Sequence, residues 1–539
     1  MSAPREAEER KSLGVEVDYV LETLVKNSAL TEAGSAKLVM AGFVAGYCAR
    51  RGQAETWELL EASDVSMRIL DFFPQREQTP EIATPFLEAR DLLWLMERYS
   101  ATELKGEMDV MVAKITNSLK EAAPETEEPM LPEDVARIHQ GMTAYADHVI
   151  HIEGPASTAP SLLGACRVLG KMQTDSDLDA NDLLGLALEI GKHNLAVIEA
   201  LDRVHVETFG QPTLTPVPCR PRPGKCILIT GHDLKDMQSL LEITDSLDIS
   251  VYTHGEMIPG HAYPKLHEHK SLYGNFGTAW QNQRKEFPTF PGPMLFTTNC
   301  IQMPRPSYVE RVFTTGRVAF PDCQHLEYGK WQPLIDAALA APGFTEEECM
   351  TYKDENLLVG AHHATVLSLA GTILDLVGKG AIKHFWFIGG CDGAKPGRNY
   401  FSKLAMNIPD DHVILTGACG RFRINRLKDY GDIEGIPRLL DVGQCNDVYS
   451  AIRIAMGLAE ALKCDINDLP LSLVVSWYEQ KAVVQLLTLL HLGLKNIKLG
   501  PSLPKALSPE VIGVLVDKFG ISLTDPSKVQ SDIAEVTDK

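Results

Sequence analysis

Residues 225–256 read KCILITGHDLKDMQSLLEITDSLDISVYTHGE, and this stretch decides the fold. The apolar run Lys225–Thr230 is rich in β-branched residues and predicts a strand. Apolar residues then recur at helical spacing over Leu234–Asp245, and a second strand pattern covers Ile249–Tyr252. A strand, a helix and a second strand in this order form a βαβ unit, which pairs its strands in parallel. The stretch therefore predicts an α/β architecture.

The same alternation continues toward the C-terminus. Further strand-like runs are found at Met294–Thr298, Lys383–Ile388, His412–Thr416 and Leu471–Val475. The length of this region suggests two α/β domains with mainly parallel sheets, divided near Gly343–Leu358.

The region before residue 211 has a different pattern. Apolar residues recur at helical spacing and strand-like runs are nearly absent, which predicts an all-α domain. The expected helices are Val15–Ala29, Ala36–Ala49, Ala83–Tyr99, Glu107–Ala122 and Leu183–Leu201. Five prolines in Gln211–Gly224 predict an extended, stiff linker. We therefore expect a helical-bundle domain at 1–215, a first α/β domain at 216–357 and a second at 358–539.

Charge and cysteine content exclude several classes of partner. The sequence has 51 Lys and Arg against 72 Asp and Glu residues, a net charge of −21, so nucleic acid and anionic membranes are unfavourable partners. The N-terminus lacks the apolar core of a secretory signal, and no apolar run is long enough to span a bilayer. Eleven dispersed cysteines without a small-domain disulfide pattern are typical of a reducing compartment, so we expect a cytoplasmic protein.

Residues suited to metal binding follow the strand-like runs. Each lies just past the end of an apolar run, where the loops of an open parallel sheet converge and bind ligands. They are His232, Glu256, Cys300, Cys391, Cys419, Cys445 and Glu479. Glycines crowd the same turns, which lets the backbone approach a bulky group. A single residue of this kind is more often part of the protein core. Seven of them at the edges of sheets favour a metal-binding site.

The donor types indicate which kind of metal centre this would be. Structural zinc sites usually use CxxC pairs, and the sequence contains none. Thiolates, an imidazole and carboxylates on separate loops suit a large iron cluster bridged partly by sulfide and partly by oxygen. The other seven cysteines fit helices, loops or the linker and are expected to be structural: Cys48, Cys166, Cys219, Cys226, Cys323, Cys349 and Cys464.

Seven motifs around these residues resemble the hybrid-cluster proteins, also called prismane proteins or hydroxylamine reductases. They are GHDLKD (231–236), YTHGEM (252–257), TTNC (297–300), IGGCDGAKPGRNY (388–400), ACGRFR (418–423), DVGQCNDVYSA (441–451) and SWYEQKA (476–482). The resemblance implies that the seven residues named above ligate a hybrid iron–sulfur–oxygen cluster, with a persulfide at Cys391. It also implies an N-terminal helical domain and two Rossmann-like α/β domains, with the cluster between them.

The N-terminus departs from the family. Family members begin with a cysteine-rich motif that binds a second, cubane cluster, whereas here residues 1–47 contain no cysteine and Cys48 stands alone. A single thiolate cannot hold a cubane. We therefore expect the hybrid cluster without the N-terminal cubane cluster, and an electron donor protein of unknown type.

The resemblance implies an oxidoreductase that reduces hydroxylamine to ammonia, nitric oxide to nitrous oxide, or both. Protons would come from Glu256, Glu479, His254 or Lys481, and Cys391 would take part through its persulfide. An alternative role for Lys481 is to neutralise Glu479. Two other functions stay open: a nitric-oxide-sensing or protein S-nitrosylating cluster protein with little turnover, and an enzyme like carbon monoxide dehydrogenase.

Overall fold

The computed structural model describes residues 132–174, 180–298, 300–320, 322–391, 399–476, 480–500 and 509–537. Four of the five helices expected in the N-terminal region, those before residue 123, lie outside the described residues, and so does most of the expected helical bundle. The chain divides into two compact units. Among the described residues, the first unit contains 132–143 and 155–193, and the second contains 144–154 and 194–537.

The described part of the first unit is helical. It contains α7 (Ala159–Thr174) and the beginnings of α6 (Pro132–Glu153) and α8 (Ala180–Phe209). Buried apolar residues such as Leu186 and Ile190 recur one helical turn apart, as expected for an amphipathic helix. The helix predicted at Leu183–Leu201 is confirmed by α8.

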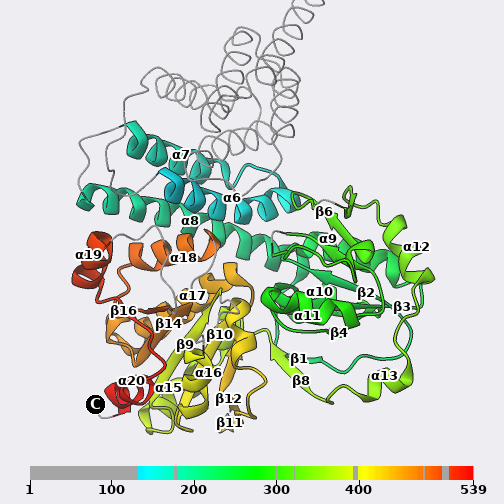
Figure 1. Ribbon diagram of the computed structural model, residues 1–539. Helices are drawn as coiled ribbons and strands as arrows, with labels where there is room; N and C mark the ends of the chain where they lie inside the picture. Colours follow the sequence, from blue (N-terminus) through cyan, green and yellow to red (C-terminus); the bar gives the residue numbers. More distant parts are fainter. Residues whose placement is uncertain are drawn as a thin grey trace, which may run out of the picture. The chain divides into compact units, whose positions relative to one another are not determined.

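The second unit contains two six-stranded sheets whose strands are all parallel (Figure 1). The first sheet has the spatial order β4-β3-β2-β5-β6-β7. Its strands are β2 (Lys225–Thr230), β3 (Ile249–His254), β4 (Leu272–Asn275), β5 (Met294–Phe296), β6 (Val312–Thr315) and β7 (Gln324–Leu326). In chain order this is 3-2-1-4-5-6, the arrangement of doubly wound folds, whose ligands bind where the order reverses. That point lies between β2 and β5.

The second sheet repeats this arrangement, with the order β13-β10-β9-β14-β15-β16. Its strands are β9 (His384–Gly390), β10 (His412–Gly417), β13 (Leu439–Asp441), β14 (Leu471–Ser476), β15 (Lys498–Gly500) and β16 (Ser522–Leu523). A small antiparallel pair, β11 (Asp432–Ile433) and β12 (Ile436–Pro437), precedes β13. The two mainly parallel sheets predicted from strand and helix alternation are therefore confirmed.

Side chains alternate between the two faces of each sheet and meet different helices. In β2, Ile227 and Ile229 join a core with α9 and α12, whereas Cys226 and Leu228 join an aromatic core on the other face. The helices of this part are α9 (Leu234–Thr244), α10 (Pro264–His267), α11 (Gln283–Glu286), α12 (Gln332–Ala340) and α13 (Glu346–Met350).

The second sheet is covered in the same way. Trp386 and Ile388 of β9 pack in a core with residues of α16 and α20. Phe385 and Phe387 point to the opposite face and line an apolar cavity together with residues of α15, α17 and α18. The helices of this part are α14 (His363–Ser368), α15 (Ala370–Gly378), α16 (Tyr400–Asn407), α17 (Val448–Leu462), α18 (Gln480–His491), α19 (Pro509–Phe519) and α20 (Val529–Thr537).

The proline-rich segment is partly extended, as predicted, but it also forms a strand. β1 (Thr215–Pro218) pairs antiparallel with β8 (Asn356–Val359), and Pro216 lies opposite Leu358. The two six-stranded sheets lie on either side of β8 in the sequence. The predicted domain boundaries at 215/216 and 357/358 stay a prediction.

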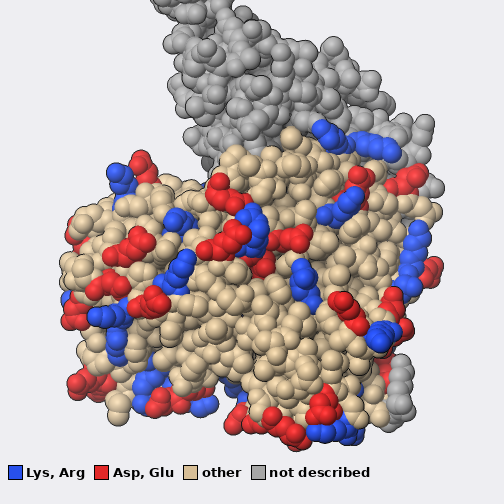
Figure 2. All heavy atoms as spheres, turned by 180° about the vertical axis from the view of Figure 1, so that it is seen from behind, with Lys and Arg blue, Asp and Glu red and all other residues tan. Residues whose placement is uncertain are grey.

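The acidic excess is not gathered into one patch on the face that Figure 2 shows, where acidic and basic side chains are interspersed. Within the described part of the chain, none of the helices has the length and apolar character needed to cross a membrane.

Candidate metal centre

Six of the seven predicted ligand residues are described, and they follow strands of the two sheets. His232, Glu256 and Cys300 follow β2, β3 and β5, and Cys391, Cys419 and Cys445 follow β9, β10 and β13. Because all strands of a sheet are parallel, each set of three lies at one sheet edge. Glu479, which follows β14 in the sequence, lies outside the described residues.

Short 3₁₀-helices carry three of these residues. Glu256 lies in η1 (Gly255–Ala262), Cys419 in η5 (Ala418–Arg423) and Cys445 at the start of η6 (Cys445–Asp447). His232 directly precedes Asp233, whose carboxylate accepts from the backbone N–H groups of Lys235 and Asp236 and so caps α9. The capped helix α9 thus fixes the turn that carries His232.

The two sheet edges meet at His232, Glu256 and Cys445. The Cys445 Sγ lies 3.3 Å from His232 Nε2, which in turn lies 3.6 Å from Glu256 Oε2. The backbone N–H of Cys445 donates to Glu256 Oε2 at 2.8 Å. One atom from each of the three side chains falls within 4.8 Å of the others, which is close enough to share one metal ion or cluster.

Cys419, Cys300 and Cys391 belong to the same neighbourhood. Burial raises the pKa of the Cys419 thiol well above its usual range, and the negative charges of Glu256, Cys300 and Cys391 raise it further. Four acidic groups near one another repel each other as anions. A positively charged iron cluster would remove that repulsion and keep the thiols deprotonated.

Glu256 gives the clearest sign that a cation belongs here. Its carboxylate is buried, and its Oε1 atom has no hydrogen-bond partner among the described residues, although Arg421 NH2 lies 3.6 Å away. Burial would raise the pKa of Glu256, but the neighbouring His232 ring and the charge of Arg421 outweigh burial and lower the pKa. An ionised buried oxygen without a partner is costly. A metal ion at Oε1 would satisfy it, so the donor set fits an iron cluster.

His232 is oriented and uncharged, as a metal ligand must be. Burial lowers the pKa of His232 to about 3, and the positive charge of Lys481 acts in the same direction. The ring Nδ1 lies 2.8 Å from Thr298 Oγ1, so Nε2 points toward Glu256 and Cys445. Such a hydrogen bond on the far ring nitrogen commonly fixes a metal-binding imidazole.

Gln444 ties the loops of the two sheets together. Its side-chain NH₂ donates to the backbone oxygens of both His232 and Glu256, each at 2.9 Å. Gln444 is the residue before Cys445, so one amide sets the position of a second-sheet thiol relative to two first-sheet ligands. The sequence motif contained Gln444, but no periodicity or spacing rule assigned this role to it.

Arg421 is a second positioning residue that the sequence did not identify. Its guanidinium is fully buried and donates to Asp441 Oδ2 at 2.9 Å and to the backbone oxygens of Ala418 and Gly443. Ala418, directly before Cys419, has a positive φ of 57°. Arg421 therefore stabilises a strained turn beside one thiol and the loop that leads to another.

Two glycines allow the backbone to reach these positions. Gly231 has a φ of 119° and Gly390 a φ of 101°, and they directly precede His232 and Cys391. A Cβ atom at Gly231 would collide with Thr297 and Thr298, and one at Gly390 with the backbone of Ser476. The tight turns expected from these glycines are therefore found at both positions, whereas their approach to a bulky group stays a prediction.

The predicted proton donors lie in different places. The buried Lys481 has its Nζ 3.4 Å from His232 Nε2 and lines a cavity with Cys391, Cys445 and Gln485. His254 instead uses both ring nitrogens within the first sheet, at 3.0 Å from Thr230 Oγ1 and 3.2 Å from Glu286 Oε2.

Tyr145 of α6 is a further polar contact at the site that sequence reasoning missed. Its hydroxyl donates to Cys445 Sγ at 3.3 Å. Tyr145 belongs to a helix that is distant from Cys445 in sequence, so this contact depends on tertiary packing and could not be predicted from a sequence pattern.

The remaining described cysteines differ from the ligand set. Cys226 and Cys349 pack in the aromatic core of the first sheet, and burial raises the pKa of Cys226 to about 12, so its thiol stays protonated. Cys166 and Cys219 are also buried, and Cys323 and Cys464 are half-buried. Cys48 lies outside the described residues.

Comparisons with known proteins agree with these features. Residues 60–534 match the model of the Prismane/CO dehydrogenase family. A hydroxylamine reductase of Moorella thermoacetica is 48% identical over 398 residues, which cover 74% of this chain and 91% of the relative. Two further hydroxylamine reductases are similar. That of Syntrophobacter fumaroxidans is 47% identical over 74% of each chain, and that of Solidesulfovibrio magneticus is 50% identical over 71% of this chain and 70% of the relative.

Solved structures share the fold at much lower identity. An as-isolated, Ni-free carbon monoxide dehydrogenase from Thermococcus sp. AM4 aligns with a TM-score of 0.55 and 16% identity, over 96% of this chain and 85% of that one. Carbon monoxide dehydrogenase IV from Carboxydothermus hydrogenoformans aligns with a TM-score of 0.56 and 15% identity, over 94% of this chain and 88% of that one.

Gln444→Leu tests the link between the sheets. The change keeps the approximate side-chain size but removes both donors, so two buried carbonyl oxygens lose a partner. We expect the free energy of unfolding to fall by about 2 kcal/mol. Urea denaturation of the purified protein measures this, with Gln332→Leu as the control, since Gln332 bonds Asp336 at the exposed surface. Equal effects of the two changes would contradict the assigned role.

Proposed function

Because this chain belongs to the Prismane/CO dehydrogenase family, we propose that it is a hydroxylamine reductase built around a hybrid iron–sulfur–oxygen cluster. The observation that carries the proposal is the convergence of His232, Glu256 and Cys445 from two sheets, with an ionised Glu256 oxygen that no described residue hydrogen-bonds. These donors match the mixed imidazole, carboxylate and thiolate set that the sequence resemblance implies.

The cluster would be held by the seven residues at the sheet edges: His232, Glu256, Cys300, Cys391, Cys419, Cys445 and Glu479. Cys391 would carry the persulfide, and Glu479 would complete the set from the loop after β14. When bound, the cluster supplies electrons and an iron that holds the nitrogen–oxygen substrate.

The chain's own groups would supply the protons. Reduction of hydroxylamine consumes two electrons and two protons and releases ammonia and water. Lys481 is the best placed donor, because its Nζ lies 3.4 Å from a ligand nitrogen of His232 and faces the cavity beside Cys391 and Cys445. His254 is a weaker candidate, since its hydrogen bonds to Thr230 and Glu286 occupy both ring nitrogens. Glu256 and Glu479 would act mainly as cluster ligands and not as proton donors.

Nitric oxide is a second candidate substrate, and one specific observation favours it. The cavity at Cys391 and Cys445 shares Phe387, Val448 and Leu489 with the larger apolar cavity between the second sheet and α15, α17 and α18. Such walls suit a small apolar molecule better than hydroxylamine, which needs hydrogen-bond partners. Reduction of two nitric oxide molecules to nitrous oxide and water also consumes two electrons and two protons.

The two other functions have less support. Relatives at 47–50% identity are named hydroxylamine reductases, whereas the carbon monoxide dehydrogenases match at 15–16% identity and share the fold. A nitric-oxide-sensing or S-nitrosylating protein would keep the same cluster with little turnover. Steady-state activity of protein with full iron content separates that function from a reductase.

We further propose that this chain has no N-terminal cubane cluster. Cys48 is the first cysteine of the sequence, and one thiolate does not hold four irons. A donor protein would then pass electrons directly to the hybrid cluster, because this chain would have no second cluster to relay them. The net charge of −21 would repel an acidic donor.

Iron content tests both parts of the cluster proposal. Wild-type protein prepared without oxygen should contain iron for one polynuclear cluster per chain. Cys445→Ala should lose most of this iron, because it removes a ligand where the two sheets meet. Cys226→Ala should keep it, since Cys226 lies in the aromatic core. Iron for two clusters in the wild type, or equal iron in the two variants, would contradict the proposal.

Lys481→Met tests the proton donor. We expect kcat for hydroxylamine reduction to fall by about 100-fold or more, since general acid catalysis contributes on this scale. Iron content and the electron paramagnetic resonance spectrum should match the wild type, and Lys403→Met at the exposed surface should have no effect. Loss of iron together with activity would assign Lys481 a structural role instead.

The source of electrons is tested by comparing donors under strict anaerobiosis. Reduced viologen is small and should support slow hydroxylamine reduction. An acidic ferredoxin-type donor should be much poorer at low salt, because like charges reduce its rate of association. Fast turnover with the acidic donor at low salt would reveal an electron entry route that the proposal lacks.

A further inference from the structure

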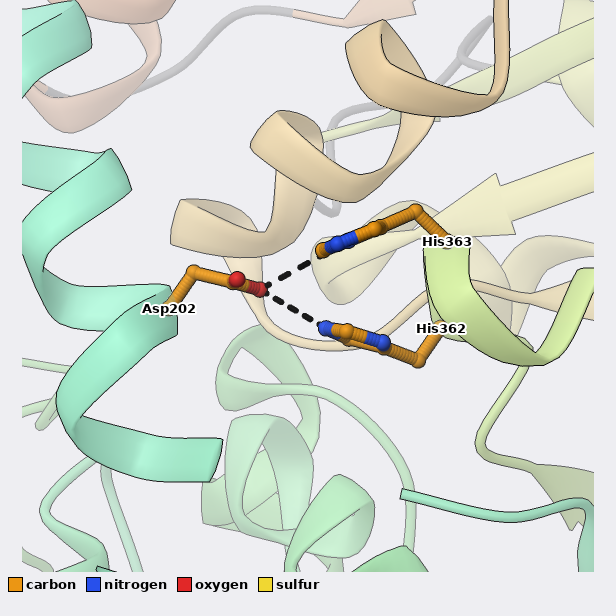
Figure 3. Close-up of side chains that lie close together, drawn as sticks. All are labelled: Asp202, His362 and His363. Atoms are coloured by element: carbon orange, nitrogen blue, oxygen red, sulfur yellow. Dashed lines mark hydrogen bonds and ion pairs between the residues drawn. The ribbon is translucent and has the colours of Figure 1, made fainter. Parts of the chain in front are cut away.

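Two histidines and one aspartate form a second cluster of metal-binding side chains. Asp202 comes from α8, His363 is the first residue of α14, and His362 is the residue that caps this helix, a short loop after β8 (Figure 3). The Asp202 Oδ1 atom lies 2.8 Å from His362 Nε2 and 3.8 Å from His363 Nδ1. Both rings point their nitrogens at one carboxylate, and one donor atom from each residue lies within 4.8 Å of the others.

We propose that Asp202, His362 and His363 bind a divalent transition-metal ion. Two imidazoles and one carboxylate, without a thiolate, suit Zn²⁺ or Fe²⁺, with water in the open coordination positions. Bonds of about 2.0–2.1 Å around a tetrahedral ion place neighbouring donor atoms about 3.3 Å apart. The two observed separations from Asp202 Oδ1 lie on either side of this value, so small side-chain rotations would complete the site.

Exposure of the three side chains suits an ion that enters from solvent. The relative exposures are 12% for Asp202, 4% for His362 and 16% for His363. The donors are therefore shielded from water but not sealed in the core. An ion could reach them without unfolding, and the reduced competition from water strengthens its attraction to the carboxylate.

The protonation of His363 favours metal binding. Burial, then the neighbouring His362 ring, lowers the pKa of His363 to about 4, so its imidazole is neutral near pH 7. A neutral imidazole has the lone pair that a metal needs. Nearby charges of opposite sign, Glu199 and Arg453, meet at the hydroxyl of Tyr449, at 3.0 Å and 2.8 Å. The positive charge of Arg453 also lowers the pKa of His363, whereas Asp202 is the anion that faces the two rings and raises it.

A simple hydrogen-bonded link between α8 and α14 is the competing explanation. In that case His362 Nε2–H donates to Asp202, while His362 Nδ1 accepts from Ala364 N at 3.3 Å. This accounts for His362, and a hydrogen bond with Ser450 Oγ at 3.0 Å accounts for His363 Nδ1, but neither bond explains why His363 Nδ1 also faces Asp202. His363 Nδ1 is too far from Asp202 Oδ1, at 3.8 Å, for a hydrogen bond, although it is within the spacing of two ligands on one ion.

Metal binding requires modest rearrangement around the rings. The Gln211 side-chain amide lies 2.6 Å from His362 Nδ1, and turning this amide by 180° would place its oxygen there to accept Nδ1–H. His362 Nε2 would then present its lone pair to the ion, at the loss of the long contact from Ala364. Ser450 Oγ, 3.0 Å from His363 Nδ1, would give up that contact but keep the backbone N–H of His363 at 3.0 Å.

The site would stabilise the region behind Cys445. Ser450 belongs to α17, which begins directly after η6 and therefore after the Cys445 loop. An ion would connect α8 with α14, and the backbone N–H of His363 would still join α14 to Ser450 at the start of α17. The inference is independent of the proposed function, because none of the three residues is a cluster ligand.

Zinc binding to the full-length protein, purified without oxygen, tests the site directly. The protein is incubated with Zn²⁺, passed through gel filtration and analysed for zinc content and by zinc K-edge X-ray absorption, which iron does not mask. We expect one tightly held Zn²⁺ per chain with only nitrogen and oxygen neighbours, including two imidazoles. Sulfur neighbours would place the zinc at the cysteine ligands instead and would overturn the proposal, as would an absence of retained zinc.

Variants assign the zinc to these residues. Asp202→Asn and His363→Ala should each lose the retained zinc while keeping the iron content of the wild type. His269→Ala is the matched control, because His269 pairs with Asp245 at 2.7 Å without a second imidazole in the described contact. It should keep the zinc. Retention of zinc by both Asp202→Asn and His363→Ala would contradict the proposal.

Discussion

A carboxylate held in the protein interior constrains the centre of this structure. Glu256 lies at the edge of the first sheet, buried and ionised, where isolation from water is costly. His232, the backbone N–H of Cys445 and the guanidinium of Arg421 surround it, yet one of its oxygens lacks a hydrogen bond from any residue that the structure describes. A cation at that oxygen would satisfy it. We therefore regard the loops of both sheets as shaped around a metal cluster.

The two sheets make this arrangement possible by using the same strand order twice. In each sheet the first strand lies beside the second and the fourth, so their loops emerge together at one edge. His232 and Cys300 flank this point in the first sheet, and Cys391 takes the corresponding position after β9 in the second. Gln444 and Arg421 then join the loops through hydrogen bonds to backbone oxygens. The hydrogen bonds that hold the loops together thus also set the positions of the proposed ligands.

Local sequence patterns predicted the strands well and the polar contacts poorly. The apolar run that ends at Thr230 indicated both the strand and the position of His232, because a parallel sheet presents its ligands at the strand ends. Residues that act through tertiary contacts were not identifiable. Arg421 and Gln444 stand in quoted motifs, but their bonds reach across loops. Tyr145 comes from a distant helix. The role expected for Glu479 stays a prediction, since it lies outside the described residues.

The central claim is that the edges of the two sheets enclose one iron cluster, and iron anomalous diffraction tests it most directly. Crystals of protein prepared without oxygen would be measured on both sides of the iron absorption edge. The account predicts one compact group of anomalous peaks in contact with His232, Glu256 and Cys445, and a peak within bonding distance of Glu256 Oε1. A group of iron peaks bound elsewhere, or full iron content with no peak beside Glu256, would contradict it.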